Sequence, residues 1–347
     1  MFASDNNAGA SAPVMATLAE ANHGATPAYG ADEWTAHAKA MIAEWFETDV
    51  EVYFLSTGSA ANCLAIAATH RPSGKTLCHV DAHIARDEYG GPSMFAPGMM
   101  LVGLDGPAGK ITPAALQTAL GDHEGERHGR LTMMSLTNVN EIGQTYTPSE
   151  IQTLAEIAKT RLMAVHIDGA RFANALAHTG ASPAELTWKS GVDMLSLGFT
   201  KTGAWCAEAL VIFNGDRLAD TYFRHRVMGQ QLSKNRVFAA QFVAMLHDNH
   251  ALTLAARANA SAAALGDALT ESGKARLANP VASNEVFAFL APGAADALKA
   301  AGVTCYPWVS LSRALPAPPH EGWVLHRFVA SFQTEPAHIE AVRSALA

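Results

Sequence analysis

The most informative segment of the chain is Leu195-Ser196-Leu197-Gly198-Phe199-Thr200-Lys201-Thr202-Gly203-Ala204-Trp205, in which a lysine follows an apolar run. About one strand–helix unit earlier, Leu162-Met163-Ala164-Val165-His166-Ile167-Asp168 ends another apolar run on an aspartate. Pyridoxal phosphate uses such a pair, because a lysine forms its Schiff base and an aspartate pairs with its protonated pyridine nitrogen. The two segments together predict a pyridoxal phosphate site that contains Lys201 and Asp168.

Helical and strand patterns alternate along the chain, which favours an α/β fold with a mainly parallel sheet. Thr147-Pro148-Ser149-Glu150 combines a threonine cap, an early proline and an acid at the third position, so a helix is expected to start there; Ser182-Pro183-Ala184-Glu185 repeats this signal. We expect strands at residues 50–55, 76–80, 98–104, 131–136, 162–167, 193–198, 207–213, 285–290 and 323–330. The other helices are expected at residues 33–46, 60–69, 247–270, 293–301 and 335–347.

The bulk properties exclude several classes of protein. A net charge of −8, a pI of about 6.0 and the lack of any lysine or arginine run argue against a nucleic-acid surface. The start of the chain is polar where a signal peptide needs an apolar run, and no apolar stretch approaches the roughly 20 residues that span a bilayer. The cysteines are far apart, without metal-binding spacing, and indicate buried thiols in a reducing compartment: Cys63, Cys78, Cys206 and Cys305. We expect a cytoplasmic protein without a membrane partner.

Two further segments carry candidate cofactor contacts. Thr57-Gly58-Ser59-Ala60-Ala61-Asn62 lies at a strand-to-helix junction, where free backbone N–H groups and the Ser59 hydroxyl can hold a phosphate. The alternative is an ordinary helix cap. Asp168 lies at the carboxyl end of a parallel strand, where α/β sites are built, or else caps the segment 171–178. Arg171, three residues on, can bind a carboxylate through two parallel hydrogen bonds, or form a plain surface pair with an aspartate.

The segment His79-Val80-Asp81-Ala82-His83 admits two interpretations. Its spacing could suggest a metal site, but no third ligand is apparent, so we expect no metal. A histidine that stacks on the pyridine ring and can act as a base fits better, because imidazole is flat and titrates near neutral pH. In that interpretation one histidine faces the core and the other faces the site.

These residues resemble the low-specificity L-threonine aldolases, which are fold-type-I pyridoxal phosphate enzymes. Residues 166–172, 57–62 and the Lys201 segment carry the resemblance, and residues 2–11 and 28–32 extend it over nearly the whole chain. Within the family, the phenylserine aldolase branch is most similar. That similarity lies in residues 172–176, 182–189 and 232–236.

The resemblance implies an aspartate aminotransferase-like fold: a mainly parallel, seven-stranded sheet and a smaller α+β C-terminal domain. Residues 1–30 would form an N-terminal segment that contributes to the site and an interface. Residues 31–246 would form the large cofactor-binding domain. Residues 247–347 would form the small domain, beginning with a long alanine-rich helix.

The resemblance also implies roles for individual residues. Lys201, Asp168 and His83 would be catalytic, with His83 stacked on the cofactor ring. The implied cofactor contacts are Gly58, Ser59, His83, Asp168, Arg171, Thr200 and Lys201. The implied substrate contacts are Ser4, Tyr29, Glu88, Asn140, Arg171 and Arg327. Among these, Arg171 and Arg327 would hold the substrate carboxylate, and Tyr29 would come from a neighbouring subunit of a homodimer or homotetramer.

One departure from the family pattern concerns specificity. Many threonine aldolases place a histidine near the substrate hydroxyl, but Thr137-Asn138-Val139-Asn140-Glu141 contains none. The pocket for the β-substituent is therefore open to a different group, such as an aromatic one, and His83 is the candidate base for the hydroxyl proton.

The expected reaction is the reversible cleavage of L-β-hydroxy-α-amino acids, such as phenylserine and threonine, to glycine and an aldehyde. A β-eliminating lyase or an aminotransferase on the same fold is the alternative, and a cofactor-free scaffold is a third. Three basic residues could reach a neighbouring subunit's phosphate or be ordinary solvated charges: Arg226, Lys234 and Arg236.

Overall fold

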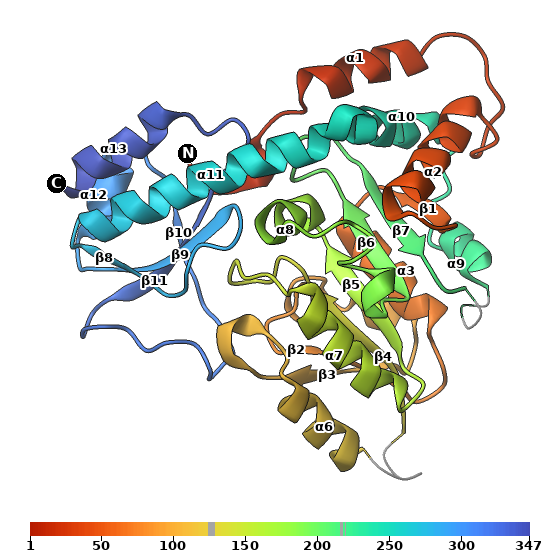
Figure 1. The fold of residues 1–347 in the computed structure, drawn as a ribbon, viewed down its shortest axis with the longest axis horizontal. Coiled ribbons are helices and arrows are strands. Elements are labelled where there is room, and N and C mark those ends of the chain that lie inside the picture. The colour runs from red at the N-terminus through yellow and green to blue at the C-terminus, as the bar shows by residue number, and fades with distance from the viewer. Residues whose placement is uncertain (124–128, 216–217, 219) are drawn as a thin grey trace.

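The computed structural model describes residues 1–123, 129–215, 218 and 220–347, and folds them around two β-sheets (Figure 1). The larger sheet has seven strands in the order β1-β7-β6-β5-β4-β2-β3. These strands are β1 (Glu51–Leu55), β2 (Gly74–His79), β3 (Met100–Leu104), β4 (Arg130–Thr137), β5 (Ala164–Gly169), β6 (Met194–Gly198) and β7 (Glu208–Ile212). Only the two pairs that include β7 are antiparallel in this sheet of the described residues. The mainly parallel seven-stranded sheet is confirmed.

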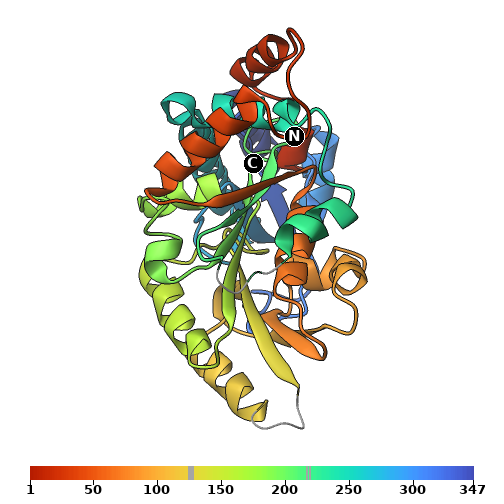
Figure 2. The same ribbon diagram turned by 90° about the vertical axis from the view of Figure 1, so that its right-hand side faces the viewer.

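The large sheet is covered on both faces, and this explains its nearly continuous apolar strands. Every residue of β5, β6 and β7 is buried. Figure 2 shows the sheet between two layers of helices. The helices of this part of the chain include α1 (Ala12–Ala21), α2 (Glu33–Phe46), α3 (Gly58–Ala68), α4 (His83–Arg86), α5 (Gly91–Phe95), α6 (Pro113–Asp122), α7 (Pro148–Lys159), α8 (Phe172–Thr179), α9 (Thr221–Val227) and α10 (Arg236–Leu246).

A single long helix, α11 (His250–Glu271), leads from the large sheet to the second one (Figure 1). The second sheet has four antiparallel strands in the order β10-β11-β9-β8. Its elements are β8 (Ala275–Leu277), β9 (Glu285–Leu290), β10 (Tyr306–Pro307), β11 (Val324–Val329), α12 (Ala294–Ala300) and α13 (Pro336–Leu346). The expected α+β C-terminal part is therefore present.

The N-terminus joins the core of this second sheet. Phe2 is fully buried there. Its N–H donates to the Thr304 carbonyl at 3.1 Å, and its carbonyl accepts from the Val329 N–H at 2.9 Å. The chain then runs from the small sheet to the large one within its first residues. This path brings Ser4 and Asp5 between the two sheets.

The prediction of a helix after Ser182 was wrong. The reciprocal cap contacts do form, since the Ser182 N–H donates to Glu185 Oε2 at 2.8 Å and the Glu185 N–H donates to Ser182 Oγ at 3.2 Å. The chain nevertheless makes turns and a 3-10 segment at Trp188–Ser190. The Trp188 indole N–H donates to the Phe46 carbonyl at 2.7 Å. This tertiary contact favours the observed non-helical backbone over a continued helix.

Two predicted boundaries also shift, because non-glycine residues adopt a left-handed backbone there. Asp248 and Asn249 have φ of 49° and 54°, so residues 247–249 form a separate turn before α11. Leu162 has φ of 56°, and β5 begins only at Ala164. In the described part of the chain, no helix combines the length and apolar character needed to cross a membrane.

Candidate active site

A cavity of about 540 Å³ lies where the parallel strands of the large sheet end and the second sheet approaches. The carboxyl ends of such strands are the usual place for a site in an α/β fold. Ten of the predicted site residues line it: Ser4, Gly58, Ser59, His83, Asn140, Asp168, Arg171, Thr200, Lys201 and Arg327. Segments from the whole length of the chain therefore meet at one place, as the sequence analysis expected.

The first turn of α3 opens onto this cavity. The Thr57 hydroxyl caps the helix by accepting from the Ala60 N–H at 3.1 Å. Gly58 and Ser59 follow at the first helical positions, and no acidic residue occupies this turn. A helix start with an apolar or neutral first turn attracts an anion through its N–H groups and its dipole. The ordinary cap and the predicted phosphate contact are thus compatible.

Asp168, at the end of β5, lies in the cavity wall with its carboxylate held from two sides. Oδ2 accepts from Asn62 Nδ2 at 2.8 Å, and Oδ1 accepts from the Ala170 N–H at 3.1 Å. The residue at the cap position of α8 is Arg171, so the alternative role of Asp168 as a helix cap is not seen. The two donors fix the orientation of this carboxylate in the cavity wall.

Asn62 belongs to the segment 57–62, but no role was predicted for it from the sequence. Its Nδ2 donates to both Asp168 Oδ2 and Glu88 Oε1, each at 2.8 Å. It lies one helical turn after Gly58 on α3, on the side that faces the strand ends. That spacing from the phosphate turn was the available signal.

His83 and Glu88 form a hydrogen-bonded pair, with Nδ1 and Oε1 2.9 Å apart. This hydrogen bond is the main reason that the pKa of His83 is raised. Burial raises the pKa of Glu88. Glu88 lies behind His83 and outside the cavity lining, so its expected influence on substrate would act through His83. The second histidine, His79, is buried, and its Nδ1 accepts from the Asp81 N–H at 3.2 Å.

Glu141 and Glu208 also line the cavity, and neither was identified from the sequence. Burial raises the pKa of Glu141 and of Glu208 to about 7 in each case. Glu141 Oε1 accepts from the His83 N–H at 2.7 Å and from the Thr137 hydroxyl at 3.0 Å. Glu208 lies on β7 opposite Gly198. An acid within the apolar run 207–213 was the signal for Glu208.

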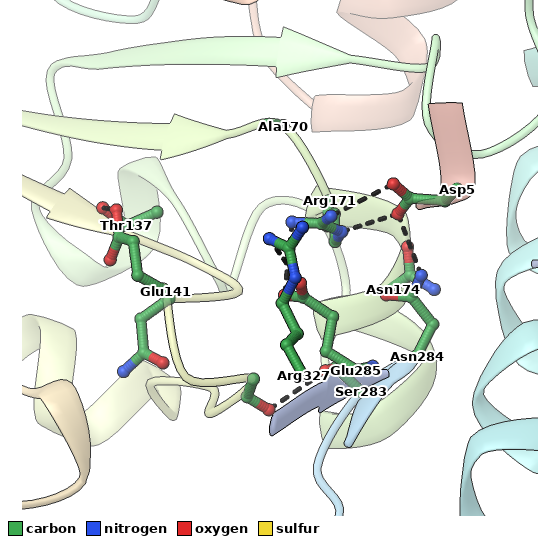
Figure 3. Close-up of polar contacts among 12 residues, drawn as sticks. Asp5, Thr137, Glu141, Ala170, Arg171, Asn174, Ser283, Asn284, Glu285 and Arg327 are labelled. Carbon is green, nitrogen blue, oxygen red and sulfur yellow. Dashed lines mark hydrogen bonds and ion pairs between the residues drawn. The ribbon is translucent and has the colours of Figure 1, made fainter. Parts of the chain in front are cut away.

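The predicted carboxylate ligands, Arg171 and Arg327, lie together, but acidic residues already hold them (Figure 3). Arg171 donates to both oxygens of Asp5, from Nε at 2.7 Å and from Nη2 at 3.1 Å. Its Nη1 lies 3.2 Å from Glu285 Oε2, and Arg327 Nη1 lies 3.8 Å from Glu285 Oε1. Burial is the largest single influence on the pKa of Asp5 and would raise it, but the charge and hydrogen bonds of Arg171, together with the Lys201 charge and the Asn284 hydrogen bond, lower it overall. The partner of Arg171 is therefore a buried acid from the N-terminus.

Asn140 lines the cavity, but its amide also holds its own loop. Nδ2 donates to the Ala108 carbonyl at 2.9 Å, and Oδ1 accepts from the N–H groups of Ile142 and Gln144 at 3.2 and 2.9 Å. The side chain thus shapes the wall of the cavity through the loop.

Tyr29 lies away from this cavity, with 61% of its surface exposed. Its N–H donates to the Ser233 carbonyl at 2.9 Å. Of the three basic residues left open, Arg226 donates to the Tyr222 hydroxyl at 3.1 Å, and Arg236 donates to the His23 and Gly24 carbonyls at 3.2 Å. Lys234 is exposed.

Comparisons with known proteins show which proteins this chain resembles. The family model described as beta-eliminating lyase matches residues 1–292. A low-specificity L-threonine aldolase from Pseudomonas aeruginosa is 38% identical over 99% of this chain and 94% of its own length. Another from Pseudomonas sp. is 35% identical over 97% and 94%. The solved structure of a Leishmania major threonine aldolase is 26% identical, with a TM-score of 0.90, covering 100% of this chain and 99% of the other.

Proposed function

Because this chain belongs to the low-specificity L-threonine aldolases of the beta-eliminating lyase family, we propose that it acts on phenylserine as well as on threonine. It is a pyridoxal phosphate-dependent aldehyde-lyase that cleaves β-hydroxy-α-amino acids to glycine and an aldehyde. The observation that carries this conclusion is the meeting of Lys201, Asp168 and the Arg171–Arg327 pair around one cavity. Position 140 is occupied by asparagine where many threonine aldolases have a histidine, and this supports a pocket that accepts a bulky β-substituent.

The residues around the cavity fit pyridoxal phosphate. Lys201 would carry its Schiff base, and Asp168, with its carboxylate held by Asn62 and Ala170, would pair with the pyridine nitrogen. Gly58 and Ser59 would hold the phosphate at the first turn of α3. The remaining proposed contacts are His83, Arg171 and Thr200. When bound, the cofactor supplies an electron sink for the electron pair released from the Cα–Cβ bond.

The side chains of this protein orient the substrate and move its proton. Arg171 and Arg327 hold the α-carboxylate, which restricts rotation of the substrate before the bond breaks. His83 removes the proton of the β-hydroxyl group as the aldehyde forms, directly or through one water. The hydrogen bond that His83 donates to Glu88 raises the pKa of His83, so the imidazole is a stronger base near neutral pH.

Product analysis on a substrate panel tests the proposed specificity. Threonine, phenylserine and hydroxyaspartate are incubated with the holoenzyme, and aldehyde, glycine, ammonia and keto acid are measured. We expect glycine and aldehyde in equal amounts, with phenylserine cleaved at least as efficiently as threonine. Ammonia released together with the 2-keto acid of the same carbon skeleton would instead indicate elimination, and a keto acid formed without ammonia would indicate amino transfer.

A Lys201→Ala variant tests the cofactor anchor. We expect the absorbance of the Schiff base to disappear and cleavage to fall by several orders of magnitude, because no other group would bond covalently to the cofactor. Retention of the Schiff-base band would remove Lys201 from this role. Ser11→Ala changes a residue outside the cavity lining and serves as the control variant, purified and measured in the same way.

We further propose a cytoplasmic homodimer or homotetramer with shared active sites. The exposure of Tyr29 outside its own cavity supports this arrangement, since the side chain is available to another subunit. The cysteines are free thiols, which suits a reducing compartment. In this proposal residues 1–30 serve the site and the interface, residues 31–246 bind the cofactor and residues 247–347 form the small domain.

A further inference from the structure

The two arginines of the site and the two acids that face them form a cluster with no net charge before any substrate binds. Two positive side chains, Arg171 and Arg327, face two negative ones, Asp5 and Glu285. The side chains of Asp5 and Glu285 are 0% and 2% exposed, so solvent screens their charges little. A substrate carboxylate that binds these arginines therefore adds a third negative charge to a balanced cluster.

The two acids are held differently. Asp5 makes two hydrogen bonds to Arg171 and accepts a third from Asn284 Nδ2 at 3.0 Å, which fixes its position. Glu285 forms an ion pair with each arginine: its Oε2 lies 3.2 Å from Arg171 Nη1, and its Oε1 lies 3.8 Å from Arg327 Nη1. Its Oε2 atom and Arg327 Nε have no hydrogen-bond partner among the described residues. Buried charged groups without such partners are costly, so Glu285 is the acid more easily separated from its arginines.

Glu285 also lies at the cavity surface with both arginines. Figure 3 shows the two guanidinium groups beside it. Arg327 is further oriented by Trp308, whose ring centre lies 4.7 Å from the guanidinium carbon. The arginines are thus placed by other contacts as well, through Asp5 for Arg171 and through Trp308 for Arg327. Their positions do not depend on Glu285 alone.

We infer that Glu285 is a resident carboxylate that competes with the substrate's α-carboxylate for Arg171 and Arg327. This inference rests on the proposed role of those arginines. Removal of the Glu285 charge should tighten the binding of any ligand with an α-carboxylate. Because the competition acts alike on bound substrate and transition state, KM should fall while kcat changes little.

The test compares two amines that differ in the carboxylate. Holoenzyme of the wild type and of Glu285→Gln is titrated with glycine and with methylamine, and the cofactor absorbance reports binding. Glutamine keeps the size of the side chain and removes its charge. We expect glycine to bind at least ~10-fold more tightly to the variant, equal to about 1.4 kcal/mol, and methylamine to bind unchanged. Exposed Glu340→Gln is the matched charge change far from the site.

Several results would overturn the inference. Weaker glycine binding in Glu285→Gln would mean that Glu285 holds the arginines in place for the substrate. An equal shift for glycine and methylamine would place the effect at the cofactor. Glu285→Asp provides an independent variant that keeps the charge but withdraws it by one methylene, and intermediate glycine affinity is expected. If Glu285→Gln does not fold, wild-type glycine affinity in Glu285→Asp also counts against competition.

An Arg327→Ala variant separates this inference from the proposed function. If glycine binding weakens in that variant but does not tighten in Glu285→Gln, the arginine role stands and only the competition fails. If glycine binding is unchanged in Arg327→Ala, the proposed carboxylate site itself is wrong.

Discussion

Burial has changed the titration of several side chains around the cavity. Glu208 is 6% exposed, and burial raises its pKa from 4.5 to about 7, partly offset by a hydrogen bond to Thr200 and the charge of Lys201. The charge of Asp168 acts in the same direction as burial. A side chain at Gly198 would collide with Glu208 Oε2, so the glycine leaves room for this acid.

Glu208 should make the stability of the cofactor-free protein fall as pH rises. Between pH 4.5 and about 7 the folded protein keeps a proton that the unfolded chain has lost, so unfolding becomes easier with rising pH. Glu208→Gln removes this effect and should raise the free energy of unfolding at pH 8 by ~1–3 kcal/mol, with little change at pH 4.5. Urea unfolding at both pH values measures it. An identical pH dependence in both proteins would contradict the assignment.

The His83–Glu88 pair should set the acid limit of catalysis. The hydrogen bond to Glu88 raises the pKa of His83, and His83 acts as a base only when unprotonated. Glu88→Gln should therefore move the acid limb of kcat/KM to lower pH. A pH–rate profile on threonine measures the shift. A limb that moves to higher pH, or stays in place, would show that another group controls it.

Two elements of this chain start with the same cap signal but end differently. Thr147 and Glu150 form a reciprocal cap that starts the twelve-residue helix α7. Ser182 and Glu185 form the same contacts before turns and a short 3-10 segment. The helix after Thr147 continues because its apolar residues repeat on one face and pack on the sheet, whereas Trp188 anchors the other segment to Phe46.

The two caps form a matched pair of variants. Thr147→Ala should lower the free energy of unfolding by ~1 kcal/mol, because it leaves N–H groups of α7 without their acceptor. Ser182→Ala should cost less, since no α-helix depends on that cap. Denaturant unfolding of both variants measures the difference. An equal or larger loss for Ser182→Ala would show that the turn itself depends on its cap.

Across the whole molecule, the N-terminal segment connects the two sheets and the site. Phe2 lies in the core of the second sheet, and three residues later Asp5 holds Arg171 beside the large sheet. Tyr29 ends this segment on the outside, far from the cavity that Ser4 lines. One segment therefore lines the cavity of its own chain at its start, and in the proposed oligomer its end would reach another subunit.

Mixing two inactive variants tests shared sites. Tyr29→Ala and Lys201→Ala should each be inactive alone, because each lacks one part of every site. If subunits exchange after unfolding and refolding together, a mixed dimer has one complete site, and roughly a quarter of wild-type activity should return. Sites built within one subunit would give no recovery. Refolded wild-type protein provides the reference.

Much of the site could be predicted because its chemistry is encoded in short segments. Lys201, Asp168, Gly58 and His83 each follow an apolar strand, and strand ends of a parallel sheet meet at one edge. The helix after Ser182 was mispredicted because the cap signal is local and does not include Trp188's contact with Phe46. Glu141 and Glu208 were missed because an acid in a sequence shows neither its burial nor what faces it.

The sequence alone was enough to predict the strands, several of the helices and the residue types that the cofactor needs, because hydrophobic periodicity and local backbone preferences act over a few residues. The tertiary structure alone decided how charges pair. Asp5 meets Arg171 across 166 positions, and Glu285 lies between two arginines that are themselves far apart in the chain. Such pairings depend on distances through folded space and on burial, which strengthens each charge interaction, and neither quantity is present in a linear chain.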